Sequence, residues 1–541
     1  MLYSFPQGSY LQHWLPACIS LCLLLIAGRL IYNLWLHPLS HIPGPIWARA
    51  SGIPSWLHAR GGKRHLWLTR QFQIFGPKIR VTPNTVLFLD PEAYAQIYGM
   101  KSNVRRSHFY TAFQPKSGEA NTLNTVDVAE HAHKRKLLKT CFTEKSVRAA
   151  SEFITKHQSR LGGRRKGGWS APINFSDSVD TLVFDIMGDL GFGRSFDIKE
   201  PGGANNPLKV IPHTIASYMR FYYPLCRAPF LPLLLWLKPR GLDRVFGLLT
   251  PPAVRQYNAF VYDNITRRIQ LHREQQQKPD LEKRQDMFHF LCEARDPDTD
   301  LPAYTETDLR AESSLLIVAG SDTTSISLSG LFFYLTGDPA RLTKLTHEIR
   351  TTFPDDSADE IVHGPKLLGY RYLAACIDEG MRLTPTGPSE LPREVLPGGI
   401  VIKGEYYPPG TIVGTCPWAD SRNEDVHEGR DAGSFRPERW IVDLAGTGVS
   451  AESVARLRSN FHPFAMGPGS CLGKNLAMME IMIIVARTLH RLDVRRAPGS
   501  NLGGGGPGMG WGAEDERQMQ LEDAYVALRQ GPEVQFRKRV S

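Results

Sequence analysis

Residues 464–473 have the sequence FAMGPGSCLG. A helix is predicted directly after them, because Leu476, Met479 and Ile483 place apolar side chains at helical spacing. A thiolate is stabilised beside a helix N-terminus, and the flanking glycines free backbone N–H groups and let a flat macrocycle come close. The segment therefore predicts that Cys471 is a ligand. Taken alone, the cysteine has the alternative of being a buried residue in a glycine-rich turn.

This loop resembles the haem-ligand loop of the cytochrome P-450 family at Phe464, Gly467, Cys471 and Gly473. The resemblance implies that these residues bind haem b and that Cys471 is the axial ligand of its iron. It implies a mainly α fold with small β-sheets. It also implies a monooxygenase that inserts one atom of dioxygen into an organic substrate, with thiolate donation favouring cleavage of the O–O bond.

Residues 319–324, AGSDTT, lie in the middle of a long predicted helix and resemble the oxygen-activating segment of that family. The resemblance implies that Ala319 and Gly320 border the cofactor and make room for dioxygen. It implies that Asp322 and Thr323 are the catalytic pair that relays protons. Residues three and four positions apart share a helix face, so the Thr323 hydroxyl can bond back to a carbonyl one turn earlier. A helix with incidental threonines is the alternative.

Three further residues resemble partners of the haem carboxylates. His131 and Arg135 occupy positions where relatives carry tryptophan and arginine, and Arg393 matches a second propionate-binding arginine. Two buried propionates need charged partners. The basic segment 131–139 has an alternative interpretation as a solvated face that docks an acidic partner. The chain departs from the family at His131 and at Gly469, where most relatives carry arginine, so we expect weaker haem retention.

A buried charge network is also implied. Glu379 and Arg382 lie three residues apart on one helix face, which by itself is an ordinary surface pair of small energetic value. Together with Arg439 they resemble the Glu-Arg-Arg network of the family. We expect a structural role, because a buried network is costly unless it is complete and serves to hold the core in one arrangement.

The amino terminus differs from the rest of the chain. Residues 14–36 are almost uniformly apolar, approximately the length that spans a bilayer, and the positive charges follow the apolar core. The sequence predicts a membrane anchor over 1–36, a proline-rich elbow over 37–46 and a catalytic domain over 47–541. The positive-inside rule places that domain in the cytosol, and the resemblance implies a single-pass anchor in the endoplasmic reticulum membrane. A cleaved signal peptide is the alternative.

Composition sets wide bounds. The chain has 541 residues, ordinary apolar and charged fractions and a formal net charge of +10. Lys and Arg are spread along the chain, so we expect no nucleic-acid partner. The eight cysteines form no CxxC pair, which argues against a disulfide scaffold and for a reducing compartment.

The pattern of elements favours one mostly helical domain. A capping-box pattern at 305–308 opens a helix that ends before Asp338-Pro339. The last strand-like segments, 525–528 and 534–536, are predicted to pair as a hairpin. The other predicted strand segments are an early hairpin over 78–89 and short pieces at 399–402 and 411–414.

The resemblance further implies that electrons come from NADPH through a membrane-bound NADPH–cytochrome P-450 reductase, with cytochrome b5 as a second donor. Residues 32–39 look particularly like filamentous-fungal members, many of which serve secondary metabolism. The apolar stretch 221–236 predicts either a surface that dips into the bilayer, which favours a lipophilic substrate, or a core helix. The open alternatives for function are an isomerase or dehydratase of this fold that needs no reductase, and a non-catalytic membrane haem protein.

Overall fold

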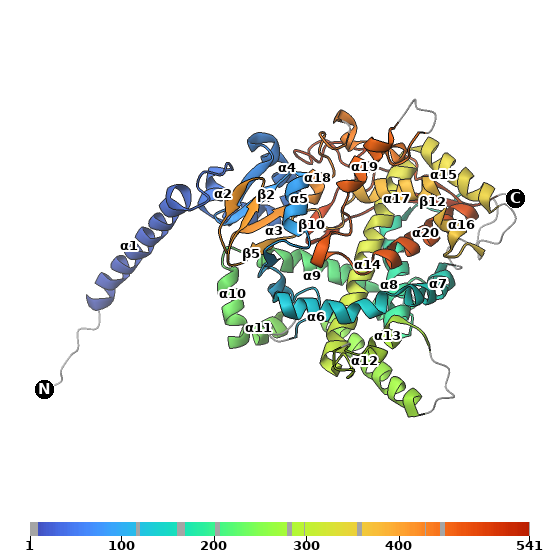
Figure 1. The fold of residues 1–541 in the computed structure, drawn as a ribbon, viewed down its shortest axis with the longest axis horizontal. Coiled ribbons are helices and arrows are strands. Elements are labelled where there is room, and N and C mark those ends of the chain that lie inside the picture. Colours follow the sequence, from blue (N-terminus) through green and yellow to red (C-terminus); the bar gives the residue numbers. More distant parts are fainter. Residues whose placement is uncertain are drawn as a thin grey trace.

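The first described helix projects from a body of helices in the computed structural model, which describes residues 9–114, 119–158, 168–200, 206–277, 284–296, 298–353, 360–427, 429–443 and 449–539 (Figure 1). The α-helices are α1 (Ser9–Ile31), α2 (Ile46–Ala50), α3 (Ile53–Arg60), α4 (Arg64–Phe75), α5 (Pro91–Tyr98), α6 (Val128–Leu138), α7 (Glu144–Gln158), α8 (Phe175–Phe192), α9 (Ile211–Cys226), α10 (Leu231–Leu237), α11 (Leu242–Leu249), α12 (Pro252–Gln277), α13 (Met287–Glu293), α14 (Glu306–Gly337), α15 (Pro339–Thr352), α16 (Pro365–Leu368), α17 (Arg371–Leu383), α18 (Pro417–Asp420), α19 (Ala451–Ser459) and α20 (Lys474–Arg491). The strands are β1 (Lys78–Thr82), β2 (Thr85–Phe88), β3 (Val104–Arg106), β4 (Ile173–Asn174), β5 (Arg393–Val395), β6 (Ile400–Ile402), β7 (Glu405–Tyr407), β8 (Ile412–Thr415), β9 (Leu492–Arg496), β10 (Glu522–Ala524), β11 (Val526–Leu528) and β12 (Glu533–Lys538).

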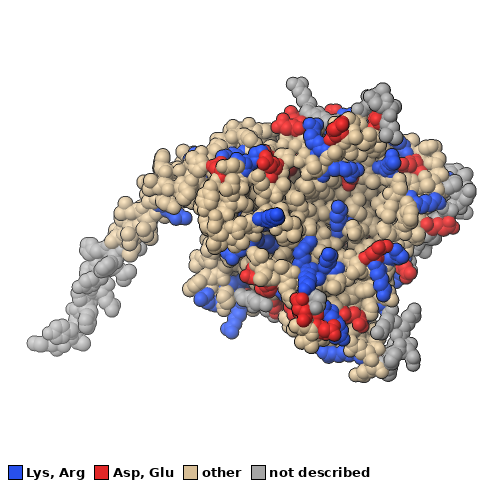
Figure 2. Space-filling view, viewed as in Figure 1, with Lys and Arg blue, Asp and Glu red and all other residues tan. Residues whose placement is uncertain are grey.

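The projecting arm is α1 followed by one π-helical turn over Tyr32–Leu36. The stretch Pro16–Leu36 is long and apolar enough to cross a bilayer, and almost none of it is buried. Figure 2 shows the described part of the arm almost free of charged side chains, whereas the body carries acidic and basic residues side by side. The arm is therefore a candidate membrane anchor.

The elbow between arm and body is held to the body by hydrogen bonds. Arg80 N donates to Pro43 O at 2.7 Å, and Asn33 Nδ2 donates to Ala50 O at 2.8 Å. A Cβ on Gly44 would lie 2.3 Å from Arg80 O, so the chain comes this close to β1 only because residue 44 is glycine. The elbow is therefore packed against the body and does not form a free linker.

α14 is the central helix of the body. The predicted capping box is present, with Asp308 N donating to Thr305 Oγ1 at 3.2 Å, and the helix runs for 32 residues. The residue directly after α17 lies close to α14 at Gly330, where a Cβ would lie 2.2 Å from Thr384 Oγ1. One apolar cluster joins α8, α14, α17 and α20. This packing holds the middle of α14 against the beginning of α20.

The sheets are small and join distant parts of the chain. The early hairpin is confirmed: β1 and β2 pair antiparallel, and the larger sheet has the order β1-β2-β8-β5-β3. In this sheet β3 and β5 are antiparallel, and their register places Arg106 directly opposite Arg393. The predicted strands near 400 and 412 are present as β6 and β8. The mainly α fold with small sheets is confirmed.

The predicted pairing of the last two strand segments is wrong. β11 folds back on β10 through Tyr525, while β12 pairs with β9 and β4. Turn signals favour glycine and proline, and they pointed to Gly531-Pro532, but the actual turn residue is a tyrosine at φ +76°. The true partners of β12, β9 and β4, both come from much earlier in the chain, which local signals do not reveal.

Candidate active site

The Cys471 loop lies directly before α20, where the sequence predicts a helix. Cys471 N donates to Phe464 O at 2.8 Å, which closes the loop. Gly467 has φ +62°, and a Cβ there would lie 2.1 Å from Tyr98 O. Only glycine satisfies both the left-handed backbone and this close approach. Gly467 therefore sets the shape of the loop without lining the cavity described next.

Cys471 lines a mainly apolar cavity of about 430 Å³, together with Phe464 and Gly473 of the same loop. Ala319, Gly320 and Thr323 of α14 also line this cavity. The structure thus brings the two segments singled out in the sequence to one space, of a size typical for ligand pockets. Burial raises the pKa of Cys471, while N–H groups at the start of α20 and the charge of Arg135 act against the rise.

The middle of α14 has the local geometry that the sequence predicts. Thr323 Oγ1 donates to Ala319 O at 2.8 Å. Gly320 packs against α8, since a Cβ at residue 320 would lie 2.5 Å from Cε of Met187. Met187 also lines the cavity. Because residue 320 has no side chain, Met187 can pack closely against α14 there. Gly320 also leaves space in the cavity.

Asp322 does not line the cavity. Burial, and then the negative charge of Asp180, raise the pKa of Asp322 to about 7, and Arg529 acts in the opposite direction. Successive residues of a helix point in directions about 100° apart, so Asp322 and Thr323 have different surroundings. Among the described residues no hydrogen bond joins their side chains. The structure thus separates the acid from the alcohol.

His131 lies near three cationic side chains, those of Arg135, Arg393 and Arg106, the last of which the sequence did not single out. Burial, and then the charges of the three arginines, lower the pKa of His131 to about 3. Within the described part of the chain the arginines donate to carbonyl and hydroxyl oxygens and pair with no carboxylate. The Nε2 atom of His131 is buried and has no hydrogen-bond partner among the described residues. This donor set fits the two carboxylates of haem b.

Gly469 lies against Arg393. Its φ is outside the left-handed region, but a Cβ there would lie 2.7 Å from Arg393 Nη2. The Arg393 guanidinium thus occupies the space in which a side chain at 469 would begin. The arginine charge expected at position 469 is absent from this chain. Arg106 lines the cavity and supplies another cation there.

Glu480 of α20 also lines the cavity and was not predicted. It is 1% exposed, and its Oε1 has no hydrogen-bond partner among the described residues. Burial raises the pKa of Glu480 to about 8, against a hydrogen bond with Thr324, so this carboxyl holds its proton at neutral pH. The available signal was a single acidic residue inside the apolar run that follows Cys471.

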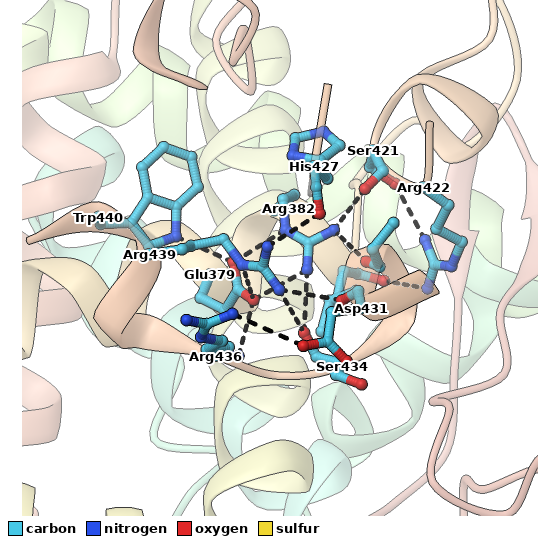
Figure 3. Close-up of polar contacts among 12 residues, drawn as sticks. Glu379, Arg382, Ser421, Arg422, His427, Asp431, Ser434, Arg436, Arg439 and Trp440 are labelled. Atoms are coloured by element: carbon cyan, nitrogen blue, oxygen red, sulfur yellow. Dashed lines mark hydrogen bonds and ion pairs between the residues drawn. The ribbon is translucent and has the colours of Figure 1, made fainter. Parts of the chain in front are cut away.

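Glu379, Arg382 and Arg439 lie together in the core (Figure 3), and Arg382 also lines the cavity. Arg382 Nε and Nη2 each donate to the Glu379 carboxylate at 2.8 Å, and Arg439 Nε donates to it at 3.0 Å. Arg382 Nη1 also donates to Ala432 O at 2.6 Å, which ties α17 to the segment before Cys471. Burial alone would raise the pKa of Glu379, but the two arginines hold it below its usual value.

Comparison with known proteins gives the same family as the motifs. Residues 43–502 match the family model for cytochrome P-450. The chain is 32% identical to the cytochrome P-450 monooxygenase fscF of Fusarium equiseti, over 99% of this chain and 98% of that protein. It is 30% identical to the cytochrome P-450 monooxygenase AKT7 of Alternaria alternata, over 95% of both. The chain therefore belongs to the cytochrome P-450 family and is an oxidoreductase of the monooxygenase type.

Proposed function

We propose that this protein is a membrane-anchored monooxygenase that inserts one oxygen atom into a lipophilic small molecule of fungal secondary metabolism. The arrangement that carries this proposal is Cys471 on the same cavity as Ala319, Gly320 and Thr323. An isomerase, a dehydratase or a haem carrier would use the cysteine loop but has no need of a proton-delivering segment. The proposed reaction needs both.

Haem b is the proposed cofactor, and the sulfur of Cys471 would hold its iron. Phe464, Gly467 and Gly473 shape the loop around the sulfur, and Arg135 and Arg393 would hold the haem carboxylates. When bound, haem supplies the activation of dioxygen, which thiolate donation from cysteine favours. The small residues at 319 and 320 leave space beside it.

Asp322 and Thr323 are the proposed proton-transfer residues. A carboxyl with a pKa of about 7 both takes up and gives up protons readily at neutral pH. Asp322 is therefore suited to exchange protons with the solvent outside the cavity. The Thr323 hydroxyl lines the cavity and donates to Ala319 O, so it can exchange a proton there. Because the two side chains share no hydrogen bond among the described residues, transfer between them requires a rotation of Asp322 or a water molecule.

A second membrane contact is proposed for the apolar surface of α9 and α10. Phe221 is 64% exposed, Leu233 54% and Trp236 56%, which favours the bilayer interpretation of this stretch over a core helix. α10 and α11 lie on the side of the body from which α1 projects (Figure 1). We infer that this surface rests on the endoplasmic reticulum membrane, with the body in the cytosol, and that lipophilic substrates enter from the bilayer.

The proposed electron source is NADPH through a membrane-bound NADPH–cytochrome P-450 reductase, with cytochrome b5 as a second donor. The test uses membranes that contain the full chain with or without reductase, isotopically labelled dioxygen and extracts of a fungal host as substrate. A monooxygenase gives labelled products only when reductase and NADPH are present. Products formed without reductase would indicate an isomerase or dehydratase. No product either with or without reductase would indicate a haem carrier.

A further inference from the structure

The helices α12 and α13, which lie against each other at the lower edge of the body (Figure 1), bring two histidines and a glutamate together. His272 lies near the end of α12, and His289 and Glu293 lie on α13. Each side chain offers one ligand atom, and these three atoms lie within 4.8 Å of one another. His272 Nε2 and Glu293 Oε1 are 4.0 Å apart. None of these three residues lines the cavity at Cys471, so the cluster is a separate place with metal-ligand chemistry.

Both helices present their polar side chains at the spacing of one helical turn. His289 and Glu293 are four residues apart on α13, so their side chains share one helix face. On α12, Gln276 follows His272 by four residues, and the Gln276 Nε2 atom is 3.1 Å from His272 Nε2. The side-chain amide of glutamine can turn over and present its oxygen in place of its nitrogen. The cluster therefore offers two imidazoles, a carboxylate and an amide oxygen.

Two arginines close to the cluster in the chain have carboxylate partners of their own. Arg268 lies one turn before His272, and its Nη2 donates to the two oxygens of Asp286 at 2.8 and 2.7 Å. Arg273 forms an ion pair with Glu306. Because these pairs balance the two guanidinium charges, the charges do not keep a cation away from the cluster.

We propose that His272, His289 and Glu293 form a binding site for Zn²⁺ that joins α12 to α13. Imidazole ligands suit Zn²⁺, whereas Mg²⁺ and Ca²⁺ prefer oxygen ligands. Tetrahedral bonds of about 2.0–2.1 Å place neighbouring ligand atoms about 3.4 Å apart, so the three side chains have to approach one another by roughly an ångström. Glu293 is exposed, and rotation of its side chain can supply much of this approach. Met287 of α13 lines the cavity, so a bound ion would tie part of the cavity wall to α12.

The test measures Zn²⁺ binding by the full chain, purified in detergent with its cofactor and without a histidine tag. Bound metal is first removed with a chelator, and Zn²⁺ is then titrated in competition with a chromophoric indicator. The variants are His272→Ala and His289→Ala, and His347→Ala is the matched control, because His347 is an exposed histidine of α15. We expect wild type and His347→Ala to bind one Zn²⁺ that excess Mg²⁺ does not displace. The other two variants should bind at least about tenfold more weakly, since loss of even an outer partner of a metal ligand costs about 10–100-fold in affinity.

X-ray absorption at the zinc edge identifies the ligands directly. We expect two imidazoles around the ion in wild type and one in each of His272→Ala and His289→Ala, with unchanged circular dichroism showing that the variants are folded. Absence of stoichiometric binding by wild type would overturn the proposal, and so would wild-type affinity in both variants. A sulfur ligand would also overturn it, because the ion would then be bound at a cysteine. Displacement by Mg²⁺ would do the same, because it would indicate a site of oxygen ligands.

Discussion

Replacing Glu379 by glutamine is expected to destabilise the protein strongly while preserving the size of the side chain. The carboxylate is fully buried and accepts two hydrogen bonds from Arg382 and one from Arg439. It also accepts from Trp440 Nε1 at 2.9 Å and from Arg436 N at 2.8 Å. The substitution removes the negative charge that both buried guanidinium groups face. Removing one partner of a buried ion pair costs about 3–5 kcal/mol, a large share of the 5–15 kcal/mol that typically stabilises a protein.

The assay is urea unfolding of the full chain in detergent, followed by tryptophan fluorescence and by the Soret band. Glu144→Gln is the control, because Glu144 and Arg148 form an exposed i,i+4 pair with an Nη2–Oε1 distance of 2.7 Å. Such a pair is worth about 0.3–0.5 kcal/mol. If Glu379→Gln moves the unfolding midpoint no further than Glu144→Gln does, the network does not hold the core and the reasoning is refuted.

Three further predictions follow from the cavity and the arm. Thr323→Ala should keep its haem spectrum but release more hydrogen peroxide per NADPH consumed, because the hydroxyl that delivers a proton is gone; an unchanged ratio of product to NADPH would remove Thr323 from the reaction. Folding raises the pKa of Glu480, so its contribution to stability is full below about pH 4.5 and is lost as the pH rises toward about 8. Glu480→Gln should abolish the fall in unfolding free energy that Glu480 causes between about pH 4.5 and about pH 8. Equal slopes of unfolding free energy against pH in variant and parent over this range would contradict the burial cost assigned to Glu480. Deletion of residues 1–36 should release part of the protein from membranes with haem spectra intact, and adding Leu233→Ser and Trp236→Ser should release the rest; a truncated chain that is already fully soluble would show that α10 makes no membrane contact.

Features encoded in a few neighbouring residues could be predicted from the sequence. The capping box of α14, the helix after Cys471 and the Thr323 back-bond each depend on side chains within one or two helical turns. Such local chemistry is written directly in the order of residues.

Features that depend on strand register or helix rotation could not be predicted. Arg106 matters because β3 pairs with β5 in one register, which joins residues far apart in the chain. The direction of Asp322 away from the cavity depends on how α14 is rotated against α8, and Glu480 depends on the same packing at α20. The Tyr525 turn carries neither glycine nor proline, so turn chemistry selected the wrong strand pair.

The most direct test of the proposed haem ligation is the carbon monoxide difference spectrum of the reduced protein, compared between wild type, Cys471→Ser and a control, Cys292→Ser. Cys292 is a partly buried cysteine of α13 that does not line the cavity. A hydroxyl donates far less charge to iron than a thiolate does. We therefore predict the red-shifted band of thiolate-ligated haem in wild type and in Cys292→Ser and its loss in Cys471→Ser. A Cys471→Ser variant that keeps the band would contradict the assignment of Cys471 as the haem ligand.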